Sequence, residues 1–166
     1  PMEILFVREV MRKNLAAFPA SGLVDEIRRT FHKSPAAHGQ HLYPVVSGDQ
    51  KLCGVITRKH LQKVVDDPLE FPGSLRLEEL ARSSPVVAYP DEPLRLIVNR
   101  MSDTRLTRFP VVERGDESTL LGMISLQDLL RARTHHLDEE RTRERVLRLR
   151  MPFQNSRNGK PAGRTR

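Results

Sequence analysis

The chain repeats one pattern of strands and helices, and this repeat limits the possible folds more than any other feature. Residues 43–46 read Tyr-Pro-Val-Val and residues 109–112 read Phe-Pro-Val-Val. Each is followed by a polar turn and a second matching segment, 52–61 or 120–129, in the order apolar, Gly, apolar, Ile, hydroxyl, three variable residues, Leu. Such internal similarity is typical of chains built from copies of one structural unit. We therefore predict two similar units.

Each copy has the pattern of a strand–helix–strand–strand–helix unit. Short apolar runs joined by polar turns predict strands, and Thr57 or Ser125 is expected to cap the following helix. Apolar residues at helical spacing precede the strands, namely Leu23, Ile27 and Phe31 in the first copy and Leu94, Val98 and Met101 in the second. The predicted fold class is α/β (α+β), with two βαββα repeats packed around a pseudo-twofold axis and two related clefts between them.

The boundaries follow from the repeat and from changes in composition. We predict a first repeat over residues 7–67, a linker over 68–74 and a second repeat over 75–133. Residues 134–152 are predicted to form a C-terminal helical extension, because acidic residues open the segment and arginines dominate its end. Residues 153–166 are predicted to be a disordered basic tail. The apolar opening segment suggests a piece excised from a longer protein.

The net charge of +7 lies in the C-terminal segment, since residues 1–130 carry 17 basic and 17 acidic side chains. Aromatic residues make up 5% of the chain, so platforms for stacking single-stranded bases are scarce. These two observations disfavour a nucleic-acid partner for the repeats. The basic tail leaves three alternatives open: a solvated helix with a loose tail that has no partner, attraction to anionic lipid headgroups, and binding of nucleic acid through the tail.

Features of metalloproteins and enzymes are missing from the sequence. The histidines at 38, 41, 135 and 136 have no cysteine or carboxylate cluster to complete a ligand set, so no metal site is predicted. No phosphate-binding Gly-rich loop or zinc-protease motif is present, and we predict no catalytic residues. The single cysteine, Cys53, lies in an apolar run and is expected to be a small core residue in a reducing compartment.

The repeated pattern resembles the CBS-domain pair, also called a Bateman module, over nearly all of residues 7–131. This resemblance implies a regulatory module that needs no cofactor, takes ATP, ADP or AMP as possible ligands in its clefts, and forms a homodimer. Residues 3–11 and 140–150 resemble the ends of the cytoplasmic C-terminal domain of bacterial CLC-type chloride channels and transporters. That second resemblance implies a membrane-embedded channel part in the same parent protein, a place at the cytoplasmic face of the cell membrane, and modulation of ion transport.

The resemblance also implies a ligand site. In the family, a hydroxyl followed three residues later by Asp binds a ribose, and Ser125 and Asp128 have this spacing here; a carboxylate accepts strong hydrogen bonds from ribose hydroxyls. The first copy has Thr57 and His60 instead, and a neutral His offers only one acceptor, so one ribose site is predicted. The other expected contacts are Ser84, Pro85, Val86, Val87, Phe109 and Pro110 for adenine and Arg105 and Arg108 for phosphates.

A simpler interpretation of the same residues stays open. Ser125 and Asp128 also have the spacing of a helix cap, which needs no ligand. Arg105 and Arg108 are equally consistent with solvated loop charges. In that case the chain is a structural and dimerisation module that binds no ligand.

Overall fold

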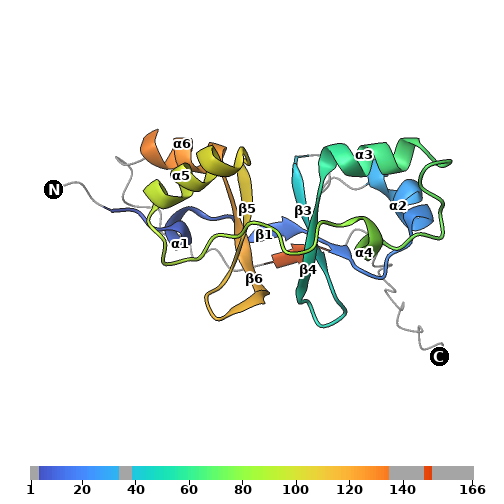
Figure 1. Ribbon diagram of the computed structural model, residues 1–166, viewed down its shortest axis with the longest axis horizontal. Helices are drawn as coiled ribbons and strands as arrows, with labels where there is room; N and C mark the ends of the chain where they lie inside the picture. Colours follow the sequence, from blue (N-terminus) through green and yellow to red (C-terminus); the bar gives the residue numbers. More distant parts are fainter. Residues whose placement is uncertain (1–3, 34–38, 135–147, 151–166) are drawn as a thin grey trace, which may run out of the picture.

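The computed structural model describes residues 4–33, 39–134 and 148–150 and shows two similar halves side by side (Figure 1). The first half contains β2 (Phe18–Pro19), α2 (Val24–Thr30), the 3-10 helix η1 (Phe31–Lys33), β3 (Leu42–Val46), β4 (Leu52–Thr57) and α3 (Arg58–Asp66). The second contains α5 (Leu94–Thr104), β5 (Arg108–Glu113), β6 (Asp116–Ser125) and α6 (Leu126–Thr134). The remaining elements are α1 (Val7–Val10), β1 (Asn14–Ala16), α4 (Leu77–Leu80) and β7 (Arg148–Arg150). The predicted fold class is confirmed.

The strands of the two halves pair in the same register. In the first repeat β2 runs parallel to β3, and β3 is antiparallel to β4 with Tyr43 opposite Ile56. In the second repeat β5 is antiparallel to β6 with Phe109 opposite Ile124. Ala88 forms a parallel bridge to β5 and so takes the place of β2. The Pro-Val-Val segments therefore pair with the Gly-apolar-Ile segments, as the sequence predicts.

This pairing defines equivalent positions in the two repeats. Phe18 pairs with Val45, and Ala88 pairs with Val111 at the matching place in the second repeat. Counting back from Phe18 and Ala88 makes Ala16 equivalent to Val86, Leu15 to Pro85 and Arg12 to Arg82. Counting back from Tyr43 and Phe109 makes Gln40 equivalent to Leu106. The differences within these pairs distinguish the two clefts described below.

Each repeat has its own core, and a third apolar cluster joins them. Phe18 and Tyr43 pack edge to face in the first core, with ring centroids 5.1 Å apart. Phe109 lies fully buried in the second core. The joining cluster takes buried side chains from β1, β3, β4 and β6, namely Leu15, Ala17, Leu42, Val46, Val55, Leu120 and Met123. Apolar burial between the two sheets thus holds the repeats together.

The repeats exchange the short helices that precede them. Helix α4 packs on the first repeat, where Leu77 is fully buried, and α1 lies beside α5 and α6 of the second, where Val7 is fully buried (Figure 1). Backbone bonds fix the crossing: Arg82 pairs with Val55 of β4, and Arg12 pairs with Met123 of β6. Each cleft is therefore lined by a segment that belongs, in sequence, to the other repeat.

Three side chains expected to be buried face the solvent. Leu23 is 36% exposed at the N-cap of α2, and Val24 is the buried residue there. Val98 is 46% exposed, and Ile97 is the buried residue of that turn of α5. Cys53 is exposed, which corrects the prediction of a core residue. The register of the β3–β4 pair shifts between Val45 and Val46 and leaves Cys53 as the extra residue of a bulge.

Strand β7 corrects the prediction of a helix at residues 148–150. It pairs in parallel with β1, with Leu149 opposite Leu15, and Leu149 packs against the cluster between the repeats (Figure 1). Tertiary pairing of this kind overrides helix propensity. Residues 135–147 and 151–166, which hold the rest of the predicted extension and tail, lie outside the described residues.

Candidate ligand-binding clefts

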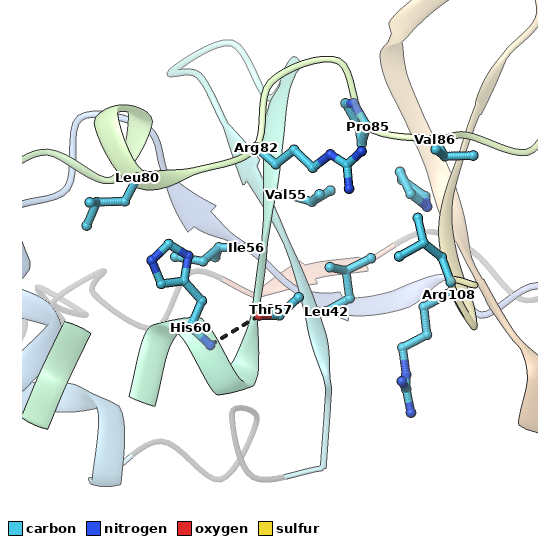
Figure 2. Close-up of a pocket in the computed structure, with 12 residues that line it drawn as sticks. Leu42, Val55, Ile56, Thr57, His60, Leu80, Arg82, Pro85, Val86 and Arg108 are labelled. Atoms are coloured by element: carbon cyan, nitrogen blue, oxygen red, sulfur yellow. Dashed lines mark hydrogen bonds between the residues drawn. The ribbon is translucent and has the colours of Figure 1, made fainter. Parts of the chain in front are cut away.

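A cavity of about 320 Å³ lies between the repeats (Figure 2). Strands β3 and β4 and the start of α3 line one side, β5 lines the other, and the linker between α4 and α5 covers it. The lining residues are Leu42, Val55, Ile56, Thr57, His60, Leu80, Arg82, Pro85, Val86, Leu106, Arg108 and Pro110. Its volume lies within the range of cavities that bind small molecules. We call this cavity the open cleft.

The polar side chains of the open cleft carry no negative charge. Arg82, Arg108 and His60 line it, and none of its lining residues is acidic. The Arg82 side chain extends towards the linker that carries Pro85, whereas the Arg108 guanidinium points away from the cavity (Figure 2). Arg82 forms no salt bridge within the described part of the chain. The cleft thus offers an unneutralised guanidinium to an anion.

The hydroxyl at the rim of the open cleft caps a helix. The Thr57 side chain accepts a hydrogen bond of 3.1 Å from the backbone N–H of His60 at the start of α3 (Figure 2). The imidazole of His60 packs edge to face on Phe71, with ring centroids 6.0 Å apart. The cap is therefore confirmed, and the position that holds Asp in the second repeat holds an aromatic ring here.

The predicted ribose pair lies in the equivalent cleft on the other side of the pseudo-twofold axis, which we call the second cleft. Ser125 and Asp128 form a reciprocal helix cap: the Ser125 N–H and hydroxyl donate to Asp128 Oδ2 at 3.0 and 2.9 Å. The Asp128 N–H donates to the Ser125 hydroxyl at 3.2 Å. Arg12 Nε donates to Asp128 Oδ1 at 2.8 Å. Both carboxylate oxygens of Asp128, whose side chain is 7% exposed, already have partners.

The backbone segments beside the two clefts also differ in whether their N–H and C=O groups have partners. In the second cleft the Gln40 carboxamide accepts from the Ala16 N–H and donates to the Ala16 carbonyl, both at 2.9 Å, and also donates to the Leu42 carbonyl. In the open cleft the equivalent residues are Val86 and Leu106, which both line the cavity, and the Leu106 side chain has no polar atoms. The Val86 N–H and C=O make no hydrogen bond within the described residues. The open cleft thus presents a free donor next to a free acceptor.

The linker that carries Val86 is fixed by a partly buried ion pair. Arg100 donates to the Val87 carbonyl at 3.0 Å and to both oxygens of Glu92. The Tyr89 N–H donates to Glu92 Oε1 at 2.8 Å. Burial opposes the charged form, but the bonds from Arg100 and Tyr89 hold the pKa of the Glu92 carboxyl below its ordinary value. This arrangement holds the covering segment in place over the cleft.

The lowered pKa predicts a loss of stability in acid. Because the Glu92 pKa is lower in the folded than in the unfolded chain, its contribution to stability is present above the unfolded value, about 4.3, and is lost as the pH falls through the folded value. We expect Glu92→Gln to lower the free energy of unfolding at pH 7 by about 3 kcal/mol. Denaturant unfolding between pH 3 and 7 measures this. An equal pH dependence in both proteins would contradict it.

The open cleft brings together only some of the predicted ligand contacts. Four of them line it, namely Pro85, Val86, Arg108 and Pro110, but they meet Thr57 and His60 rather than Ser125 and Asp128. The other four lie elsewhere: Ser84 has a positive φ of 52° and is exposed, Val87 bonds Arg100 through its carbonyl, Phe109 lies in the core, and Arg105 ends α5 with a φ of 58° and is exposed.

Arg82 and Leu106 are among the lining residues that the sequence reasoning did not assign to a ligand site, as are Leu42, Val55, Ile56 and Leu80. One signal was present: Glu9-Val10 matches Glu79-Leu80, and an arginine follows two residues later in each copy, at Arg12 and Arg82. Within the described residues no group of three His, Cys, Asp or Glu side chains is placed to hold a metal ion. No helix in the described ranges is long and apolar enough to cross a membrane.

Solved structures share this architecture. A CBS domain pair in complex with 5′-methylthioadenosine and S-adenosyl-L-methionine is 22% identical, with a TM-score of 0.61, and the match covers 80% of this chain and 98% of that one. CBSX2 in complex with AMP is 20% identical, with a TM-score of 0.63, covering 78% and 96%. The cytosolic domain of the Mg²⁺ channel MgtE in complex with ATP is 22% identical, with a TM-score of 0.57, covering 74% and 46%. At these identities the likeness concerns the fold.

Sequence relatives and the family match complete the comparison. A homoserine O-acetyltransferase of Methanohalobium evestigatum is 26% identical over 126 residues, or 76% of this chain and 24% of the enzyme. An inosine-5′-monophosphate dehydrogenase of Methanocaldococcus jannaschii is 28% identical over 92 residues, covering 55% of this chain and 17% of the enzyme. The chain thus spans about a quarter or less of the length of these relatives. The CBS domain family matches residues 7–67 and 77–135, so the chain belongs to the CBS-domain family as a tandem pair.

Proposed function

We propose that the chain is a regulatory module whose open cleft binds an adenosine-type ligand with an anionic group, of the size and charge of AMP. The observation that carries this proposal is the cavity of about 320 Å³, which is lined by both repeats and contains the unneutralised Arg82. A guanidinium forms strong charge-assisted hydrogen bonds with phosphate oxygens. Arg82 is therefore the proposed anchor for the anionic group.

The base is assigned to the backbone of Val86. Its N–H and C=O lack partners in the described structure, while the same groups of Ala16 bind the carboxamide of Gln40. Adenine has an amino donor beside a ring-nitrogen acceptor, and a carboxamide has the same two groups side by side. Pro85 and Pro110 supply apolar surface to such a base. The adenosine-derived ligands of the similar solved structures support this choice of chemical class.

Regulation follows from the position of the cleft. The cavity takes residues from β3 and β4 of one repeat and from β5 of the other, so a bound ligand contacts both. A ligand shifts a conformational equilibrium only as far as it prefers one state. We propose that the ligand prefers one relative pose of the repeats and that this pose is transmitted to the rest of the parent protein.

The parent is proposed from the ends of the chain. Residues 3–11 and 140–150 resemble those of CLC-type chloride channels and transporters, and a chloride channel or transporter at the cell membrane is the proposed parent. A long region with several apolar spans before residue 1 in the full-length sequence would support it; a parent without such spans would refute it. The homodimer stays part of the proposal, since α5 and α6 expose Leu96, Val98, Leu126 and Leu130.

Isothermal titration calorimetry with AMP tests the ligand assignment. We expect one AMP per chain, and we expect Arg82→Glu to weaken binding at least about tenfold by placing a like charge at the phosphate. Arg95→Glu makes the same charge change on an exposed position of α5 outside the cleft, and it should bind AMP like the unaltered chain. Adenosine should bind more weakly than AMP. Absence of heat at millimolar AMP, or equal affinity in the Arg82 and Arg95 variants, would refute the assignment.

A further inference from the structure

The two clefts are equivalent in fold, but equivalent backbone and arginine groups have hydrogen-bond partners in one cleft and lack them in the other. In the open cleft the Val86 backbone and the Arg82 guanidinium have no partners within the described residues. In the second cleft the equivalent backbone of Ala16 binds Gln40, and the equivalent Arg12 binds Asp128. The same sites are thus free in one cleft and satisfied by the chain itself in the other.

We propose that Gln40 and Arg12 are internal occupants that close the second cleft and limit the chain to one ligand. The Gln40 carboxamide forms the hydrogen bonds that the edge of a base would form. Arg12 binds the Asp128 carboxylate, which would otherwise accept hydrogen bonds from the ribose hydroxyls. The predicted ribose site at Ser125 and Asp128 is then a latent site, closed by two side chains. The chemical class of its ligand rests on the function proposed above.

The Gln40 carboxamide makes three hydrogen bonds, and each has the direction that a ligand base would require at this place. Gln40 Oε1 accepts from the Ala16 N–H, and Gln40 Nε2 donates to the carbonyls of Ala16 and Leu42 at 2.9 and 2.8 Å. A ligand base would have to break these bonds before forming its own. Leu106, the counterpart of Gln40, cannot form them and lines the open cleft instead. The difference between Gln40 and Leu106 therefore decides which backbone is accessible.

Arg12 closes the other half of the second cleft. Its bond to Asp128 Oδ1 uses the one carboxylate oxygen that the helix cap leaves free, because the Ser125 N–H and hydroxyl both donate to Oδ2. The Arg12 side chain is 47% exposed, so its guanidinium can leave Asp128 for water without being buried. In the open cleft His60 stands where Asp128 would be, and Arg82 has no carboxylate to bind there. Removal of Arg12 should free Oδ1 while the Ser125 cap remains.

The test removes both internal occupants of the second cleft. Because Arg12→Met also removes the guanidinium equivalent to Arg82, the probe is adenosine, which has no phosphate to anchor. In Gln40→Leu with Arg12→Met, we expect two adenosine molecules per chain at saturation by equilibrium dialysis instead of one. A further Asp128→Asn change should return the stoichiometry to one. Gln40→Ala serves as the alternative variant where Leu at this position prevents folding.

Amide hydrogen exchange provides a readout that needs no ligand. Gln40→Leu alone should speed exchange of the Ala16 N–H at least about tenfold, while Arg12→Met alone should leave it unchanged. An unchanged Ala16 rate in Gln40→Leu, or a double variant that still binds one adenosine, overturns the inference and leaves the proposed function standing. If the unaltered chain binds neither AMP nor adenosine but the double variant binds one adenosine, the inference holds and the proposed function fails.

Discussion

Replacing Gly54 with Ala is expected to lower the free energy of unfolding by about 3 kcal/mol and to abolish ligand binding in the open cleft. A Cβ at Gly54 would lie 2.6 Å from the Arg82 carbonyl oxygen and 3.1 Å from its carbon. These are backbone atoms, so the clash is relieved only by separating the two segments. The paired bonds between Val55 and Arg82, of 3.0 and 2.8 Å, would then lengthen or break, at about 1 kcal/mol each.

The consequence for the cleft follows from the same contact. The bonds to Val55 hold Arg82 against β4, and Pro85 and Val86 continue from it along the cleft. Displacing Arg82 moves both the proposed phosphate anchor and the proposed base contact. Urea denaturation and AMP calorimetry on the Gly54 variant measure the two effects.

Two other glycines provide controls for this prediction. Gly48 has nothing within 4 Å of a built Cβ, so Gly48→Ala should change the free energy of unfolding by less than about 0.5 kcal/mol. Gly122 is the counterpart of Gly54, and its Cβ would lie 2.6 Å from the Arg12 carbonyl oxygen. Gly122→Ala should destabilise the chain to a similar degree while AMP binding persists. A Gly54 variant as stable as the Gly48 variant would contradict the close approach.

Replacing Arg28 with Met is expected to lower the free energy of unfolding by about 3 kcal/mol. The Arg28 guanidinium donates to backbone carbonyls at the end of α3 and in the turn after it, namely those of Val64 at 2.9 Å, Val65 at 3.2 Å, Asp67 at 3.4 Å and Phe71. The carbonyls at the end of a helix lack partners within the helix and carry its negative pole. Met keeps an apolar stem but leaves the partly buried carbonyls of Val64, Val65 and Phe71 without this donor, which accounts for the cost. The Asp67 carbonyl keeps its bond from the Phe71 N–H.

The adjacent arginine offers a matched comparison. Arg29 is exposed, and its side chain makes one long bond of 3.3 Å to the Asp25 carbonyl. Arg29→Met should therefore cost less than about 0.5 kcal/mol. Thermal unfolding of both variants at neutral pH separates the two roles. Equal melting temperatures would show that the carbonyl contacts of Arg28 contribute nothing to stability.

The sequence predicted the parts of the site that depend on local pattern. Thr57 and Ser125 were expected to cap helices, and both do, because a hydroxyl before an apolar helical run bonds the first turn directly. The local pattern wrongly predicted a buried Cys53. A β-bulge interrupts the alternation of buried and exposed residues along the strand, and nothing in the neighbouring sequence indicates it. It also predicted helix at residues 148–150, where pairing with β1 from the far end of the chain stabilises a strand.

The predicted ligand contacts are divided between the two clefts for a tertiary reason. Ser125 and Asp128 share a cleft with Arg12, whereas Pro85 and Val86 share the open cleft with Thr57. The exchange of the helices α1 and α4 carries each linker across to the other repeat, through backbone bonds that no sequence spacing reveals. Sequence spacing therefore does not show which of the predicted contact residues lie in the same cleft.

The sequence by itself determined the repeat, its strand–helix–strand–strand–helix order and the difference between His60 and Asp128. These features follow from hydrophobic periodicity and turn chemistry, which act over a few neighbouring residues. Only the tertiary structure decided that one cleft is open and the other filled. That outcome depends on whether Arg12, Gln40 or Arg82 finds a partner in the folded chain. Such partners lie far away in sequence, as Asp128 does from Arg12 and Ala16 does from Gln40, so their contacts are set by tertiary packing.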